Sequence, residues 1–172
     1  PNSDFAILYR TNSQSRSMEE ALRKRDVPYR IYGGLSFYQR KEIKDLLGYF
    51  RMVINPSDEE ALKRVINYPK RGIGNTTLDK LFLAANQHEK SVWDVLENPV
   101  NHGLQFSGAV LNKMLSFREM ILTFSQMVET TNAYELASRI ASTSGILKEL
   151  YADKTVEGVS RYENIQELLS AI

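Results

Sequence analysis

The feature of this sequence that most constrains its fold is the recurrence of apolar residues at helical spacing through most of the chain. From Ile43 onward, apolar side chains recur at positions i, i+3, i+4 and i+7, the pattern of one buried helix face. The first such stretch ends at Asn55-Pro56, and a later one begins at Asn132 with Glu135 three residues on. The last stretch reaches Ile172 without a capping residue, so we expect this domain to continue beyond the chain. We predict that the chain after residue 34 forms a helical domain.

The first 34 residues have a different pattern. The segment "DFAILYR" (residues 4–10) is rich in strand formers, a helix with capping-box spacing at Ser17 and Glu20 follows, and "VPYRIYGG" (residues 27–34) alternates like a second strand. A strand, a helix and a strand in about 30 residues make a βαβ unit, and two parallel strands cannot cover both faces of their own sheet. We therefore predict a mainly α fold with a small N-terminal βαβ piece of a larger α/β domain.

Composition excludes several classes of active site. The 172 residues contain no cysteine and only two histidines, far apart in sequence, so disulfides and a histidine-based metal site are not expected. None of the nine glycines falls in a Gly-x-x-x-x-Gly-Lys-Ser/Thr frame, and no candidate nucleophile lies beside a base. No apolar run approaches the ~20 residues that span a bilayer. We expect no catalytic residue, metal or cofactor in this chain, no membrane contact, and a cytoplasmic setting.

The charges are divided unevenly along the chain. Residues 1–90 carry 16 Lys and Arg against 11 Asp and Glu, or +5, whereas residues 91–172 carry 6 against 10, or −4. Such asymmetry indicates a polyanionic partner for the first half.

The strongest candidate site is "NYPKRGIGNTTLDKL", residues 67–81, where two cations and two glycines precede a predicted helix. The first N–H groups of a helix have no partner within the helix and lie at its positive end, and glycine lets a phosphate approach them closely. We therefore predict a cradle for a phosphate at this helix start. The residues assigned to it are Lys70, Arg71, Gly72, Gly74, Thr76 and Thr77. An ordinary turn between two packed helices is the alternative. The pattern also resembles a helix-hairpin-helix turn, which grips duplex DNA by its backbone.

Two further stretches could contact nucleic acid. Residues 33–45 place basic side chains beside Phe37 and Tyr38, which suits phosphate binding with base stacking, although both aromatic residues could instead be core residues. Residues 8–16 lie where the first predicted strand meets a helix, the place at which α/β domains bind ligands. The candidate residues in these two stretches are Arg40, Lys41 and Lys44, and Arg10, Asn12 and Arg16.

Taken in order, these blocks resemble the UvrD/PcrA/Rep family of superfamily 1 DNA helicases. The resemblance is carried by "DFAILYRTNSQSRSMEEAL", "VPYRIYGGLSFYQRKEIKDLLGYFRMVINPSDEEAL" and "RVINYPKRGIGNTTLDKL". It is close over residues 4–85 and diffuse beyond about residue 90.

The resemblance implies that residues 1–36 end the first segment of a RecA-like domain, called 2A, and that residues 37–172 are most of the inserted helical domain, 2B. It implies a parent enzyme that unwinds DNA 3′ to 5′ in repair or replication, with ATP and Mg bound by segments outside this chain. It assigns duplex contact to the Gly-Ile-Gly segment, and therefore adds Ile73 to the cradle. The segment around Arg10 to Arg16 would lie near single-stranded DNA.

Two other interpretations stay open. The chain could be a regulatory domain that binds the remaining helicase domains and holds the motor shut, or a stand-alone helix-hairpin-helix DNA-binding protein. The first predicts binding to the motor core without DNA, and the duplex-binding interpretation predicts salt-dependent affinity for DNA.

Overall fold

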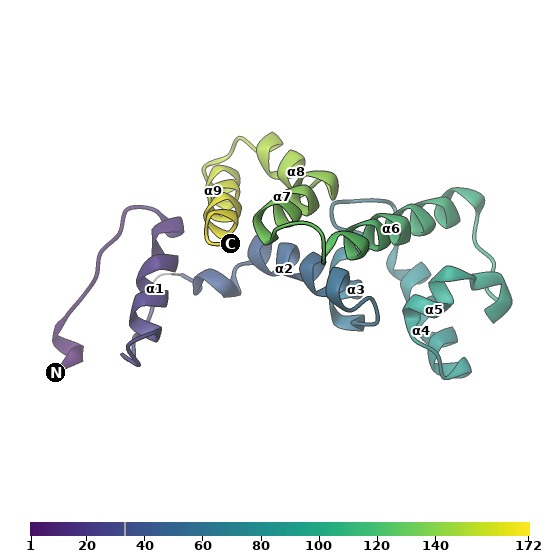
Figure 1. The fold of residues 1–172 in the computed structure, drawn as a ribbon, viewed down its shortest axis with the longest axis horizontal. Helices are drawn as coiled ribbons and strands as arrows, with labels where there is room; N and C mark the ends of the chain where they lie inside the picture. Colours follow the sequence, from purple (N-terminus) through teal and green to yellow (C-terminus); the bar gives the residue numbers. More distant parts are fainter. Residues whose placement is uncertain (33) are drawn as a thin grey trace.

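The computed structural model describes residues 1–32 and 34–172, and these residues form a helical, elongated molecule (Figure 1). No β-strand occurs among them. The α-helices are α1 (Ser15–Arg23), α2 (Lys41–Ile54), α3 (Glu59–Val65), α4 (Asn75–His88), α5 (Val92–Glu97), α6 (Gly108–Met127), α7 (Ala133–Thr143), α8 (Ile146–Ala152) and α9 (Val156–Ser170). Short 3-10 turns are η1 (Asn2–Asp4), η2 (Asn12–Gln14), η3 (Phe37–Gln39) and η4 (Pro99–His102). None of the described helices is long and apolar enough to cross a bilayer.

Several of these helices begin at the capping residues that their sequences supply. The side chain of Asn132 accepts a hydrogen bond from the N–H of Glu135 at 2.9 Å, which confirms the predicted start of α7. Ser91 and Asp94 form a complete capping box on α5. The predicted box at Ser17 is wrong, because α1 begins two residues earlier and the Ser17 hydroxyl donates to a carbonyl of the preceding turn.

Helix α2 is the centre of the hydrophobic core. Its inward face carries Ile43, Leu46, Tyr49 and Met52, all fully buried. This face packs against α3, α6, α7 and α9, which confirms the predicted periodicity from Ile43, except that Ile54 at its end is exposed. Figure 1 shows α2 in the middle of the molecule, with α7, α8 and α9 on one side and α4 and α5 beyond α3.

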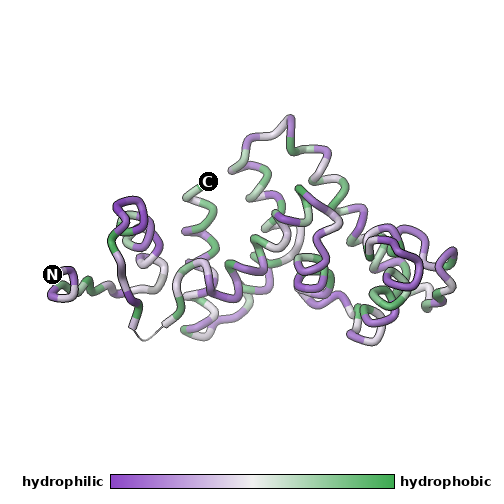
Figure 2. Tube along the Cα trace, turned by 90° about the horizontal axis from the view of Figure 1, so that it is seen from below, coloured by the Kyte–Doolittle hydropathy of each residue, from purple (hydrophilic) through white to green (hydrophobic). Residues whose placement is uncertain are grey.

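The N-terminal segment departs from the predicted βαβ unit. Helix α1 is present, but the flanking segments form no strands in the described residues, and Gly33 of the second predicted strand lies outside them. Phe5 is 83% exposed and Leu8 is 93% exposed, so the first segment is not buried. Figure 2 shows this hydrophobic stretch outside the helical body. The physical reason is that two short parallel segments without a neighbouring sheet gain too little burial to pair.

Candidate nucleic-acid interface

The loop between α3 and α4 is organised by the side chain of Asn67. Its Oδ1 atom accepts hydrogen bonds from the backbone N–H of Arg71 at 2.9 Å and of Ile73 at 3.1 Å. The Ile73 side chain is fully buried in the core. The amide of Asn67 and the burial of Ile73 therefore fix the loop from both sides and set the direction in which α4 begins.

Arg71 points into the protein, not out to solvent. Its Nη1 donates to the carbonyl oxygens of Val65 at 3.0 Å and Pro69 at 3.2 Å, and its Nη2 donates to the carbonyl oxygen of Ser144 at 3.0 Å. The predicted role of Arg71 as a bidentate phosphate donor is therefore corrected, because both terminal nitrogens already bind backbone carbonyls. Arg71 instead ties the loop to the junction of α7 and α8.

Tyr49 completes the support of the Arg71 side chain. The Tyr49 hydroxyl accepts from Arg71 Nη2 at 2.6 Å and donates to the carbonyl oxygen of Tyr68 at 2.5 Å. Burial raises the pKa of Tyr49 to about 12, against the opposing effect of the Arg71 charge. The guanidinium also lies 5.3 Å from the ring centroid of Phe117 on α6, so it is held by aromatic rings as well as by carbonyls.

The two glycines of the loop differ in what they require. Gly72 has φ of +76°, the left-handed region that favours glycine. Gly74, the N-cap of α4, has φ −78° and ψ 165°, which any residue can adopt, and a Cβ added there would meet nothing within 4 Å. The fold therefore explains the glycine at position 72 but not the one at position 74.

The first turn of α4 leaves backbone donors unsatisfied. This helix has no side-chain cap and no acidic residue in its first turn. Among the described residues, no acceptor binds the N–H groups of Gly74, Asn75 and Thr76, whereas the N–H of Thr77 donates to the carbonyl of Gly74 at 3.0 Å. Three donors at the positive end of a 14-residue helix can bind an anion.

The exposed side chains around this turn match part of the prediction. Lys70 and Thr76 are exposed and Thr77 is half-buried. Lys70, Gly72, Gly74 and Thr76 are thus exposed, whereas Arg71 is half-buried and Ile73 is buried.

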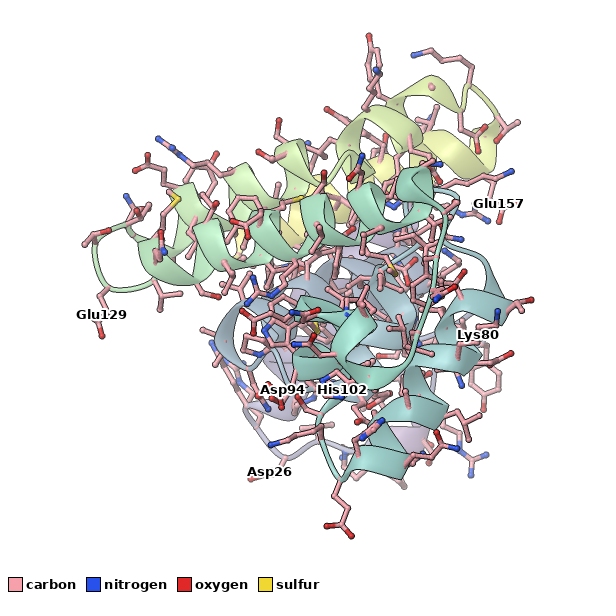
Figure 3. All side chains as sticks on the ribbon, turned by 90° about the vertical axis from the view of Figure 1, so that its right-hand side faces the viewer. Asp26, Lys80, Asp94, His102, Glu129 and Glu157 are labelled. Carbon is pink, nitrogen blue, oxygen red and sulfur yellow. The ribbon has the colours of Figure 1, made fainter. Side chains whose placement is uncertain are left out.

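Lys113 of α6 belongs to the same surface and was missed by the sequence interpretation. Its Nζ lies 2.8 Å from the position that a Cβ on Gly72 would occupy. Figure 3 shows that α6 starts on the side of the molecule where Lys80 of α4 is labelled and ends at Glu129 on the opposite side. No sequence motif around Lys113 predicts a binding role. It lies in the acidic half of the chain, and only the folded structure brings it next to the loop.

The second predicted stretch is mostly structural. Arg40 is buried, and its guanidinium donates to Asn164 Oδ1 at 2.8 Å and to Ser15 Oγ at 2.9 Å. The interpretations of Arg40 as a DNA contact and of Phe37 as a stacking platform are therefore corrected, because Phe37 is also fully buried. The Lys41 ammonium lies 2.6 Å from Asp45 and over the Tyr68 ring.

Lys44 of the second stretch is exposed, and its ammonium has no ion-pair partner among the described residues. It is the member of that stretch whose charge is available to a ligand.

The third stretch is divided in the same way. Arg16 bridges α1 to α9 through ion pairs with Glu20 at 2.8 Å and Glu167 at 2.9 Å, so its predicted role as a free DNA contact is corrected. Arg10 is exposed, and its backbone N–H donates to Gln14 at 3.0 Å. Asn12 lies in η2, and its side chain is outside the described part of the structure. Helix α1 and helix α4 lie toward opposite ends of the molecule (Figure 1), so the third stretch and the loop are separate surfaces.

Within the described residues, no group of three or more His, Asp and Glu side chains is placed to hold a metal ion.

Comparisons with known proteins give one consistent result. A family model described as the UvrD-like helicase C-terminal domain matches residues 1–172. The chain is 42% identical over 168 residues to the ATP-dependent DNA helicase PcrA of Bacillus subtilis (strain 168), covering 98% of this chain and 22% of that protein. It is 41% identical over 167 residues to the same helicase of Staphylococcus aureus (strain Mu50 / ATCC 700699), covering 97% and 23% respectively. The chain thus spans less than a quarter of the length of these curated relatives.

Proposed function

We propose that this chain, which belongs to the family of UvrD-like helicase C-terminal domains, is the duplex-engaging accessory region of an ATP-dependent 3′-to-5′ DNA helicase. In this proposal residues 37–172 form a 2B-type domain and residues 1–36 belong to a neighbouring 2A-type domain. The first half of the chain carries +5, the sign that attracts a polyanion.

The observation that carries the proposal is the start of α4. Unsatisfied N–H groups of Gly74, Asn75 and Thr76 form an anion cradle, and neither the backbone conformation nor a close contact requires glycine at position 74. A missing side chain at an exposed helix start is useful when a ligand backbone must approach those amides closely. Because backbone amides and lysines read phosphate and not bases, the proposed binding is independent of DNA sequence.

Within the proposed site the residues divide into two groups. Lys70, Gly72, Gly74, Thr76 and Thr77 contact the duplex backbone. Arg71 and Ile73 act through the loop: Arg71 holds it to the end of α7 and to α2, and Ile73 anchors it in the core.

The proposal also assigns partners to the N-terminal surface. Phe5 and Leu8 are exposed apolar residues, and we infer that they form a strand only when paired with a sheet supplied by the remaining helicase domains. ATP and Mg²⁺ would be bound by those domains, since this sequence contains no P-loop frame. Arg10 and Asn12 remain candidates for contact with single-stranded DNA, and Lys44 remains a candidate for contact with nucleic acid.

A fluorescence titration of a blunt-ended duplex at several salt concentrations tests the proposal. A cradle with a few cations should neutralise roughly 2–4 phosphates, giving a Kd of about 10⁻⁴ to 10⁻⁶ M and a slope of log K against log salt of about −2 to −4. Gly74→Val should weaken binding by blocking approach, and it should fold normally because the position opens to solvent. Lys70→Ala should weaken binding and flatten the slope by about 1.

Gly34→Val is the matched control, because a Cβ on Gly34 also meets nothing within 4 Å and Gly34 lies between α1 and η3, outside the α3–α4 loop. It should bind like the parent. If Gly74→Val and Lys70→Ala also bind like the parent, the loop is an ordinary turn and the duplex-binding role is wrong.

A further inference from the structure

A hollow of about 380 Å³ lies beside the α3–α4 loop, between that loop and α6. Its lining includes Arg71 from the loop, Asn112, Lys113 and Ser116 from α6, and Thr143 from the end of α7. The lining also includes Phe117, Met120 and Ser144, so it offers two cations, an amide and three hydroxyls beside two apolar side chains. No carboxylate is among the lining residues.

The two cations of this hollow lack acidic partners. Arg71 is bound by neutral carbonyl and hydroxyl oxygens, and neither Arg71 nor Lys113 forms an ion pair within the described residues. Most other arginines here are ion-paired, as Arg16 and Arg51 are with nearby glutamates and aspartates. Two like charges facing one space repel each other unless an anion occupies it.

We propose that this hollow binds a second phosphate of the nucleic-acid backbone, with Lys113 as the direct contact and Arg71 as a fixed positive charge behind it. The inference rests on the proposed function, which places a first phosphate at the start of α4. Lys113 Nζ lies against Gly72, and Gly74 follows at most about 7 Å along the chain, so both positions are on one continuous surface. The hydroxyl of Ser116 and the amide of Asn112 supply neutral donors for the same phosphate.

The site is bounded on the far side by an acidic residue. An adjoining hollow of about 730 Å³ along α6 is lined by Glu119 together with Ser116 and Thr123. A carboxylate there repels phosphate, so the binding surface covers the first half of α6 and not its whole length.

The test compares Lys113→Ala, Lys113→Arg and Lys90→Ala with the parent chain in the duplex titration. Lys113→Ala should lose about 5- to 20-fold in affinity at low salt, and its salt slope should fall by about 1 because one fewer counterion is released. Lys113→Arg should keep both the affinity and the salt slope of the parent chain. Lys90, just beyond the far end of α4 and about 20 Å from its start, is an exposed lysine whose removal should change neither value.

The outcomes separate this inference from the proposed function. If Lys70→Ala and Gly74→Val weaken binding but Lys113→Ala does not, the second phosphate is absent and the proposed function stands. If Lys113→Ala and Lys90→Ala reduce affinity equally, the effect is net charge and the inference is overturned. If the parent chain itself binds no duplex, both the proposed function and this inference are wrong.

Discussion

Arg71 connects the α3–α4 loop to three other parts of the molecule through its guanidinium. Its guanidinium reaches carbonyls of the loop, the Tyr49 hydroxyl on α2 and the Ser144 carbonyl at the end of α7. These contacts come from segments up to 73 residues apart in sequence. The charge therefore serves first to hold the loop in place.

We expect Arg71→Ala to lower the free energy of unfolding by about 2–4 kcal/mol, because the partly buried carbonyls of Pro69 and Ser144 lose the guanidinium that donates to them. Arg71→Lys should recover only part of that loss. The planar guanidinium reaches acceptors on two sides at once, and a compact ammonium cannot. Urea denaturation followed by circular dichroism measures both values. Unchanged stability in Arg71→Ala would show that the guanidinium is a free surface cation.

Tyr49 should make the fold sensitive to alkaline pH. Its pKa is about 12 in the folded chain, above the usual value near 10, so between pH 10 and 12 the folded state holds a proton that the unfolded state has released. Stability from this group is fully present below pH 10 and is lost as the pH rises through 12, by up to roughly 2–3 kcal/mol.

Tyr49→Phe removes that titration, so its stability should fall less steeply over the same pH range. Denaturation at pH 9, 10 and 11 measures the difference. Parallel curves for the parent and Tyr49→Phe would contradict the assignment.

At this scale the sequence located the loop but not the direction of each side chain. "KRGIG" identifies cations and glycines at a helix start, and Lys70 and Gly74 are indeed at the surface. Nothing in the local pattern distinguishes Lys70 from Arg71, because the inward turn of Arg71 depends on carbonyls of α3 and α7. The sequence pattern could not identify Lys113 for the same reason, because only the packing of α6 brings this residue close to Gly72.

At the scale of elements, α1 is joined to the rest of the molecule through polar contacts. Asn164 of α9 accepts from Arg40 at 2.8 Å and donates to Glu42 at 2.6 Å, and all three side chains are buried. Arg40 also donates to Ser15 at the start of α1, and Arg16 pairs with Glu167 of α9. This junction depends on hydrogen-bond geometry more than on apolar area.

We expect Asn164→Ala to destabilise the chain by about 2–4 kcal/mol, because it removes one partner from each of two buried charged groups. Gln166→Ala, at an exposed position of the same helix, should stay within about 0.5 kcal/mol of the parent. Thermal unfolding measures stability, and limited proteolysis near residue 24 reports the release of α1. Equal behaviour of the two variants would mean that the polar junction does not hold α1.

The helices were predictable from sequence and the N-terminal strands were not confirmed. Helical periodicity and caps such as Asn132 act within one or two turns, so they can be read locally. A strand instead needs a neighbour, and the exposed segment containing Phe5 and Leu8 has none among the described residues. Its composition therefore predicts a strand that the described residues do not form.

At the scale of the whole molecule, the two ends present different surfaces. The exposed apolar N-terminal segment lies at one end, and the loop with α4, together with the start of α6, lies toward the other (Figure 1). In our proposal the first end binds the remaining helicase domains and the second binds duplex DNA. The elongated shape keeps those two contacts apart, so both can form at once.

The central claim is that the start of α4 binds the duplex backbone, and amide NMR tests it most directly. In ¹⁵N-labelled chain titrated with a blunt-ended duplex at low salt, the N–H signals of Gly74, Asn75 and Thr76 should shift in a saturable way, because they gain phosphate acceptors. Signals of Gln87 and His88 at the other end of α4 should stay in place, and the shifts should reverse when salt is added. Saturation of binding with no change at Gly74, Asn75 and Thr76 would contradict the account.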